Sequence, residues 1–155
     1  MAVTSTPSIT WLVAKLQARY PELSLTPSDD LAWSPSANTV YYSNDSNPSE
    51  LLHEVGHSLL NHRRFDRDIT LLGMERDAWL EARKVAENLH LTVDEEVSET
   101  HLDTYRDWLH ARSTCPHCTE TGIETAARIY NCLSCGASWH VNDARRCQLR
   151  RYLVK

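Results

Sequence analysis

The chain has 155 residues, with a hydrophobic share of 41% and a charged share of 24%, which suits one modest globular domain with a small appended module. No apolar run could span a bilayer, and the first residues lack the basic start and apolar core of a signal peptide, so we expect a cytoplasmic protein without a membrane partner. The net charge of −5 is unevenly spread: residues 1–110 carry 9 Lys/Arg and 18 Asp/Glu, while residues 111–155 carry 7 and 3. An acidic body with a basic tail suggests two modules with different partners.

The first predicted element is an amphipathic helix over residues 8–20, which Pro21 ends. Residues 23–43 predict a small antiparallel sheet, because a turn rich in proline and serine precedes residues 39–42, which have strong strand preference. Such a sheet could be a structural lid over the core or an edge that binds substrate.

The next helix is predicted over residues 48–62. Asn47 is a typical N-cap, Pro48 suits the first helical position, and Glu50 stands three residues after the cap. The apolar residues around its middle predict a buried helix: Leu51, Leu52, Val55, Leu59 and Leu60.

This helix carries an H-E-x-x-H motif. His53 and His57 lie four residues apart on one helix face, close enough to bind one ion. A catalytic zinc takes three protein ligands and leaves its fourth position to water, from which Glu54 can take a proton without binding the metal. Surface contacts alone explain the motif less well, because an unpaired buried glutamate is costly. We expect His62 to be a cation at the helix end rather than a ligand.

A third zinc ligand is expected on the following helix, predicted over residues 69–89. Glu75 falls at the edge of the apolar stripe of this helix and faces inward, which makes it the preferred ligand. Asp77 lies on the polar face and stays open as the alternative ligand, or as a hydrogen-bond partner of a ligand histidine. Small alanines on the inward face would let this helix approach the metal helix closely. A further helix is predicted over residues 94–112.

Two C-x-x-C pairs separated by thirteen residues predict a second metal site. Four thiolates at this spacing form a closed tetrahedral zinc site typical of a zinc ribbon, and metal binding suits a cytosolic chain better than disulfides do. A redox-active pair is the alternative. The four cysteines are Cys115, Cys118, Cys132 and Cys135.

The end of the chain is basic. Asn142 could cap a last helix. With the motif helix and the cysteine pairs, this predicts a metallopeptidase domain over residues 1–112 and a zinc ribbon with a basic C-terminal helix over residues 113–155. This module could bind nucleic acid, with Trp139 stacking on a base. The alternative is a helix packed on the acidic body, with Trp139 covering the ribbon. The basic residues are Arg145, Arg146, Arg150, Arg151 and Lys155.

The motif helix and the run from Met74 to Trp79 resemble the ImmA/IrrE-type zinc metallopeptidases, in particular small members that end in a zinc ribbon. The resemblance extends from about residue 50 onward. It implies an α+β, gluzincin-like fold, in which a small sheet lies beside a helical bundle. It also implies zinc at His53 and His57, a carboxylate ligand on the next helix, and Glu54 as the base. Many relatives have a glutamate directly before the alanine, where this chain has Asp77.

Three functions are compatible with these features. The first is a zinc endopeptidase that cleaves a specific cytosolic protein, with a transcriptional repressor or another DNA-bound regulator as the expected substrate. The second is an SprT-like protease acting on DNA-bound proteins, although that family usually supplies a third histidine. The third is a non-enzymatic DNA-binding or adaptor protein in which both zinc ions are structural. The sequence identifies neither the substrate nor the oligomeric state, the activator or the group that stabilises the oxyanion.

Overall fold

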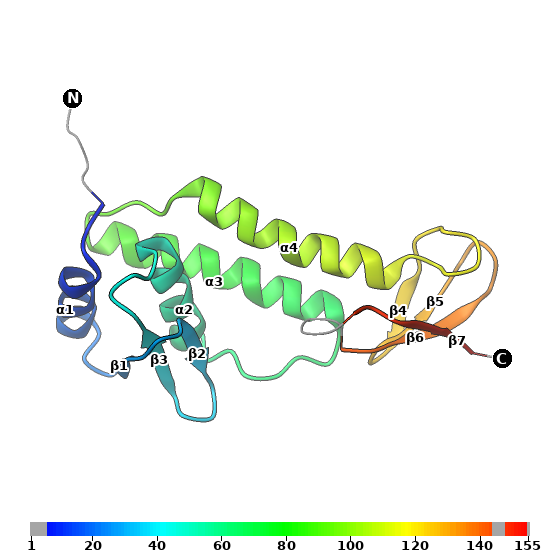
Figure 1. Ribbon diagram of the computed structural model, residues 1–155, viewed down its shortest axis with the longest axis horizontal. Coiled ribbons are helices and arrows are strands. Elements are labelled where there is room, and N and C mark those ends of the chain that lie inside the picture. Colours follow the sequence, from blue (N-terminus) through cyan, green and yellow to red (C-terminus); the bar gives the residue numbers. More distant parts are fainter. Residues whose placement is uncertain (1–5, 144–147, 155) are drawn as a thin grey trace. The chain divides into compact units, whose positions relative to one another are not determined.

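A computed structural model describes residues 6–143 and 148–154 of the chain (Figure 1). These residues have an α+β fold, as predicted. The elements, in chain order, are α1 (Ile9–Arg19), β1 (Leu25–Pro27), β2 (Ala32–Ser34), β3 (Thr39–Tyr42), α2 (Pro48–Leu59), α3 (Asp68–Asn88), α4 (Glu95–Ser113), β4 (Ile123–Ala126), β5 (Ile129–Asn131), β6 (Ser138–Val141) and β7 (Arg151–Leu153).

The chain divides into two compact units. The first contains the described residues up to Arg63 together with Met74–Glu99, and the second contains Arg64–Gly73 together with the described residues from Thr100 onward. The unit that holds the four C-x-x-C cysteines is therefore larger than the predicted module of residues 113–155.

In the first unit, α1 forms where the apolar pattern predicts it. The Ser8 side chain caps the helix by accepting a hydrogen bond from the Trp11 backbone N–H at 3.3 Å. The apolar residues of α1 that recur at helical spacing are buried: Ile9, Leu12, Val13 and Leu16.

The sheet of the first unit has the strand order β1-β3-β2. The predicted antiparallel pairing is correct for β2 and β3, which form a hairpin around the turn at Asn38. It is wrong for β1, which runs parallel to β3 with Leu25 opposite Val40. Strand preference does not encode direction. The hairpin partner β2 takes one edge of β3, and β1 pairs with the other.

Helix α2 begins as the sequence predicts. The Asn47 side chain accepts hydrogen bonds from the backbone N–H groups of Ser49 and Glu50, at 2.8 and 3.4 Å. The helix packs against β2 and β3. It ends at Leu59, three residues before the predicted end, because Asn61 adopts a left-handed conformation with a φ of 53°.

Helix α2 also approaches α3 closely at Gly56. A Cβ atom built there would lie less than 3.0 Å from the carbonyl oxygen of Ala78, closer than real Cβ atoms come to other atoms. Ala78 is fully buried, in agreement with the predicted close approach of the two helices. The absence of a side chain at Gly56 thus allows the motif helix and the helix of Glu75 to pack together.

We expect Gly56→Ala to destabilise the fold by about 1–3 kcal/mol, because the added methyl group forces backbone away from backbone. Gly73→Ala is the matched control: it also lies in a helix, but no atom lies within 4 Å of its added Cβ. This control should be neutral or up to about 1 kcal/mol more stable, as alanine is the better helix former. Thermal unfolding followed by circular dichroism compares the two, and equal melting temperatures would contradict the close contact.

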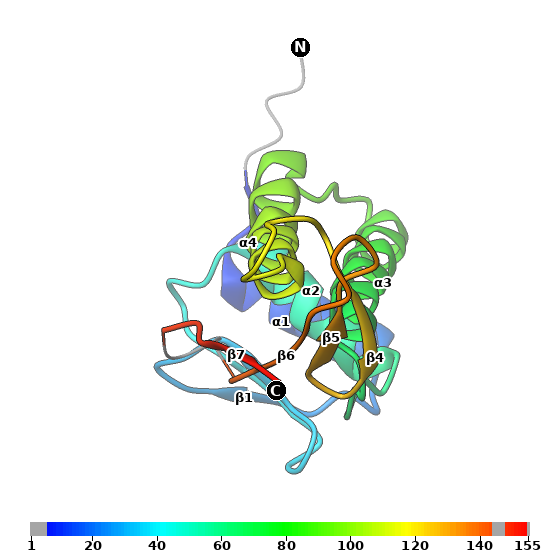
Figure 2. The ribbon, with the colours of Figure 1, turned by 90° about the vertical axis from the view of Figure 1, so that its right-hand side faces the viewer.

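The second unit contains a four-stranded sheet in the order β4-β5-β6-β7, with antiparallel pairing throughout (Figure 2). Trp139 is fully buried at its centre, and its indole N–H donates to the Arg112 carbonyl oxygen at 3.0 Å. Trp139 therefore covers the interior of the ribbon and cannot stack on a base. The residues buried with it are Cys115, Tyr130, Cys132 and Val141.

The predicted basic C-terminal helix is wrong for the described residues. Residues 151–153 form β7, in which Leu153 pairs with Trp139 and Tyr152 with His140. Strand pairing with β6 outweighs local helix preference here, because the sheet satisfies the backbone hydrogen bonds of this segment. The predicted basic residues Arg145, Arg146 and Lys155 lie outside the described residues.

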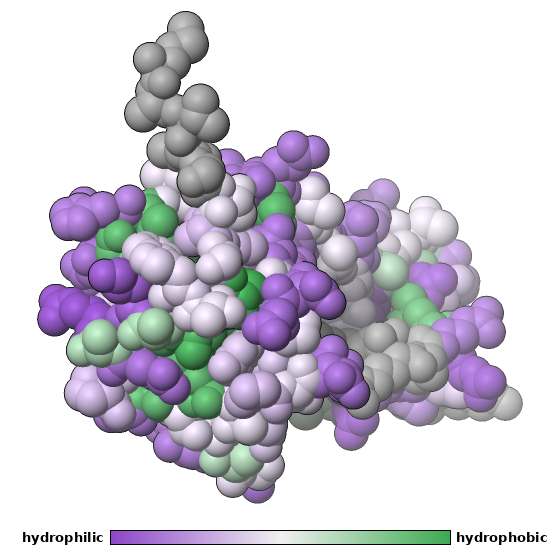
Figure 3. Space-filling model, turned by 60° about the vertical axis from the view of Figure 1, so that its left-hand side comes forward, coloured by the Kyte–Doolittle hydropathy of each residue, from purple (hydrophilic) through white to green (hydrophobic). Residues whose placement is uncertain are grey.

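Within residues 6–143 and 148–154, none of the helices combines the length and the apolar character needed to cross a bilayer. On the face drawn in Figure 3, apolar side chains form small patches separated by polar ones. Scattered patches of this kind are ordinary for a protein surface in contact with water.

Candidate metal centre

Three side chains that the sequence selects as ligands converge in the first unit. His53 Nε2 lies 3.0 Å from His57 Nε2 and 3.0 Å from Glu75 Oε2, while His57 Nε2 lies 3.3 Å from the same carboxylate oxygen. The four-residue spacing on α2 places the two imidazoles on one face of the helix, where their rings meet edge to face, and α3 brings Glu75 against them. Two nitrogens and one carboxylate oxygen therefore face a single point.

The three groups are buried. His53, His57 and Glu75 are 1%, 7% and 5% exposed, and the His53 ring stacks on Trp79 with centroids 4.3 Å apart. Burial lowers the pKa of His53, which favours the neutral imidazole. Burial by itself would raise the pKa of Glu75, but hydrogen bonds with His53 and His57 outweigh it and hold that pKa well below its usual value. A neutral imidazole and an ionised carboxylate are the forms that bind a metal.

The donor set fits a zinc ion. Two donors bound to one zinc at about 2.0–2.1 Å in a tetrahedral arrangement lie roughly 3.3 Å apart, close to the separations between these atoms. Asp77, the alternative ligand, is half-exposed and pairs with Arg76 at 2.8 Å instead. The structure brings Glu75 to the histidines and places Asp77 in an ion pair outside this set.

Glu54 is half-buried and is tied to the sheet. Its Oε2 accepts a hydrogen bond of 2.6 Å from the backbone N–H of Trp33, in the edge strand β2. The sequence gives no sign of this contact, because Trp33 and Glu54 are separated by 21 residues. The bond holds the Glu54 carboxylate beside the start of the hairpin, on the sheet side of α2.

His62 differs from the expected helix-end cation. Its Nδ1 lies 2.8 Å from Nδ1 of His57, and its carbonyl oxygen accepts a 2.8 Å hydrogen bond from the indole N–H of Trp33. Burial, followed by the nearby His57, lowers the pKa of His62, so the neutral ring is favoured over the cation. Sequence reasoning gave no role in this cluster to Trp33, Gly56 or Trp79, and it weighed His62 only as a ligand or a helix-end cation. Only the short spacing between His57 and His62 could have indicated the contact of His62.

The four predicted ribbon cysteines also meet. Their Sγ atoms all lie within 4.8 Å of one another, with Cys115 and Cys135 3.7 Å apart and Cys118 and Cys132 3.5 Å apart. Backbone N–H groups at Cys135 and Ser134 lower the pKa of Cys132, although burial opposes the effect, and so favour its thiolate. Four sulfur ligands make a closed set that could hold a metal ion and leave no position for a reacting water.

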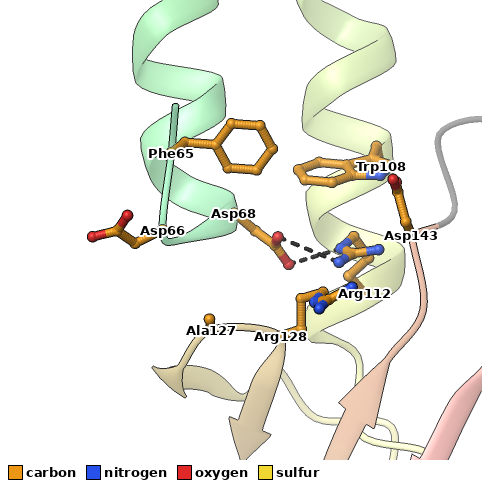
Figure 4. Close-up of a pocket in the computed structure, with 8 residues that line it drawn as sticks. All are labelled: Phe65, Asp66, Asp68, Trp108, Arg112, Ala127, Arg128 and Asp143. Carbon is orange, nitrogen blue, oxygen red and sulfur yellow. Dashed lines mark hydrogen bonds and ion pairs between the residues drawn. The ribbon is translucent and has the colours of Figure 1, made fainter. Parts of the chain in front are cut away.

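The second unit also contains a cavity of about 770 Å³ whose base is a buried ion pair (Figure 4). Arg112 binds Asp68 through two nitrogens, at 2.7 and 3.3 Å, and the Tyr130 hydroxyl donates to the same carboxylate at 2.6 Å. The Arg112 guanidinium also lies over the Trp108 ring, 4.6 Å from its centroid. Because these groups satisfy one another, the network holds the start of α3, the end of α4 and β5 together.

The comparisons with known proteins found no match for this chain. No protein-family model, no curated protein and no solved structure matches the chain.

Proposed function

We propose that this protein is a zinc-dependent endopeptidase of the gluzincin type, with His53, His57 and Glu75 as the zinc ligands. The observation that carries the proposal is the convergence of two imidazole Nε2 atoms and one buried carboxylate oxygen. Three protein ligands with one open position are typical of a catalytic zinc, whereas structural sites are closed. The four-cysteine set is the natural place for a second, structural zinc.

The chemistry follows from the groups beside the ligands. When bound, zinc polarises the scissile carbonyl and lowers the pKa of its water. Glu54 would take up the proton of the attacking water and give it to the leaving amine. The N–H of Trp33 binds one oxygen of the Glu54 carboxylate and so holds this carboxylate in a defined orientation. We also propose that an extended substrate pairs with an edge strand of the β1-β3-β2 sheet.

The substrate class rests on the resemblance to ImmA/IrrE-type metallopeptidases, relatives of which cleave transcriptional repressors. We therefore propose a DNA-bound protein regulator as the substrate. A carboxylate at Glu75, where SprT-like proteases usually have a third histidine, favours this family over that alternative. The positive charge of the C-terminal segment is compatible with nucleic acid as a second partner. Trp139 takes no part in such binding because this side chain is buried.

Zinc counting by native mass spectrometry tests the metal assignment. The wild type should hold two zinc ions, and His53→Ala, Glu75→Ala and Cys115→Ser one each. Asp77→Ala is the matched control for Glu75→Ala on the same helix and should keep both ions, because Asp77 binds Arg76 instead. Loss of zinc from Asp77→Ala but not from Glu75→Ala would overturn the ligand set. Incubation of the zinc-loaded wild type with a peptide library should give cleaved products that chelation abolishes.

A further inference from the structure

We propose that His62 is a positioning residue for the metal centre, and that it fixes the tautomer and the orientation of the ligand His57. This inference rests on the proposed function. Its central observation is the 2.8 Å separation between the Nδ1 atoms of the two rings, whose centroids lie 5.0 Å apart at an interplanar angle of 67°. A hydrogen bond between two imidazole nitrogens needs one protonated and one unprotonated partner.

The rest of the centre decides which nitrogen carries the proton. The Nε2 atom of His57 faces His53 and Glu75, so it is the metal-binding nitrogen and must be unprotonated when a metal is bound. The proton of a neutral His57 then sits on Nδ1, which donates to Nδ1 of His62. His62 therefore accepts this bond and carries its own proton on Nε2. A ligand histidine usually has such a partner, most often a carboxylate or a backbone carbonyl.

The backbone of His62 is held from two sides. Its N–H donates to the His57 carbonyl oxygen at 3.0 Å, and its carbonyl oxygen accepts the indole N–H of Trp33 at 2.8 Å. On a continuous helix, a residue five positions after His57 would point about 140° away from it. The left-handed turn at Asn61 instead ends α2 and brings the His62 ring back to His57.

Trp33 therefore contacts both Glu54 and His62, the two groups that would act on the metal centre without binding the ion. Its backbone N–H holds Glu54, and its indole N–H holds His62, which in turn holds His57. The two bonds use different atoms of Trp33 and can be removed separately. Trp33→Phe deletes only the bond to His62, since the backbone N–H to Glu54 stays.

The test is the zinc affinity of the histidine site, measured by chelator competition on full-length protein with the cysteine site loaded. His62→Phe keeps a ring but removes the acceptor, and should weaken zinc binding by about 10–100-fold. His62→Asn keeps an acceptor and should restore most of the affinity. Trp33→Phe should fall between wild type and His62→Phe. His110→Phe, at an exposed histidine of α4, is the control and should leave the affinity unchanged.

Thermal unfolding of the metal-free variants separates positioning from a general structural role. We expect melting temperatures within a few degrees of the wild type, because His62 is only half-buried. Wild-type zinc affinity in His62→Phe, or equal losses in His62→Phe and His62→Asn, would overturn the role of His62 and leave the proposed function intact. A wild type that binds no zinc at the histidine site would overturn both.

Discussion

Replacement of Glu54 by glutamine is expected to abolish peptide hydrolysis while leaving both zinc ions in place. Glutamine has nearly the same shape, and its side-chain oxygen can still accept the N–H of Trp33, as the Glu54 carboxylate does at 2.6 Å. It cannot take a proton from the attacking water, so the rate should fall by at least about 10²–10⁴-fold. Cleavage of the peptide library, followed by mass spectrometry with parallel zinc counting, measures both effects.

Glu50→Gln is the matched control for this variant. Glu50 lies one turn earlier on α2 and is also half-buried, but it stands in the first turn, outside the histidine cluster. It should retain both zinc and activity, with at most a small loss of stability from the helix dipole. Undiminished cleavage by Glu54→Gln would reject the general-base mechanism even if the zinc site proved correct.

Loss of one ribbon cysteine should have the second large effect. Cys115→Ser removes one of four sulfur ligands, and so small a sheet has little apolar interior besides Tyr130, Trp139 and Val141. Metal binding to such sites contributes about 10 kcal/mol or more to folding. We therefore expect strands β4–β7 to unfold in Cys115→Ser, and in the wild type when a strong chelator removes the metal.

Trp139 reports this unfolding, because it is fully buried in the ribbon and its emission should shift to longer wavelength on exposure. Amide NMR spectra should show collapse of the β4–β7 signals in the same sample. Cys147→Ser is the control, since Cys147 belongs to neither C-x-x-C pair and its replacement should keep both zinc ions. Retention of a folded ribbon in Cys115→Ser, with dispersed amide signals, would show that the sheet does not depend on metal.

The side chains that meet in the two clusters could be selected from the sequence because local rules govern their positions. Helical periodicity places His53 and His57 on one face, and the N-cap at Asn47 sets where that helix begins. The same periodicity distinguishes the inward Glu75 from the outward Asp77. The C-x-x-C spacing likewise predicts that the cysteines gather, and the structure brings their sulfur atoms together.

The sequence predicted less well wherever pairing between distant segments decides the structure. The direction of β1 and the strand at residues 151–153 depend on which neighbouring strand offers free backbone groups, and local preference does not encode this. Among the described residues, the predicted helix at the chain end failed at residues 151–153 for this reason.

The sequence by itself determined which groups the two clusters contain. One has two imidazoles and an acid on neighbouring helices, and the other has four thiols in two C-x-x-C pairs. Only the tertiary structure decided how those groups are held, through Trp33 on Glu54 and His62 on His57. The physical reason is that the spacing of His53 and His57 follows from the geometry of a single helix. The contacts that hold Glu54 and His62 depend instead on the turn at Asn61 and on Trp33 of β2, which lies 21 residues before Glu54 and 29 residues before His62.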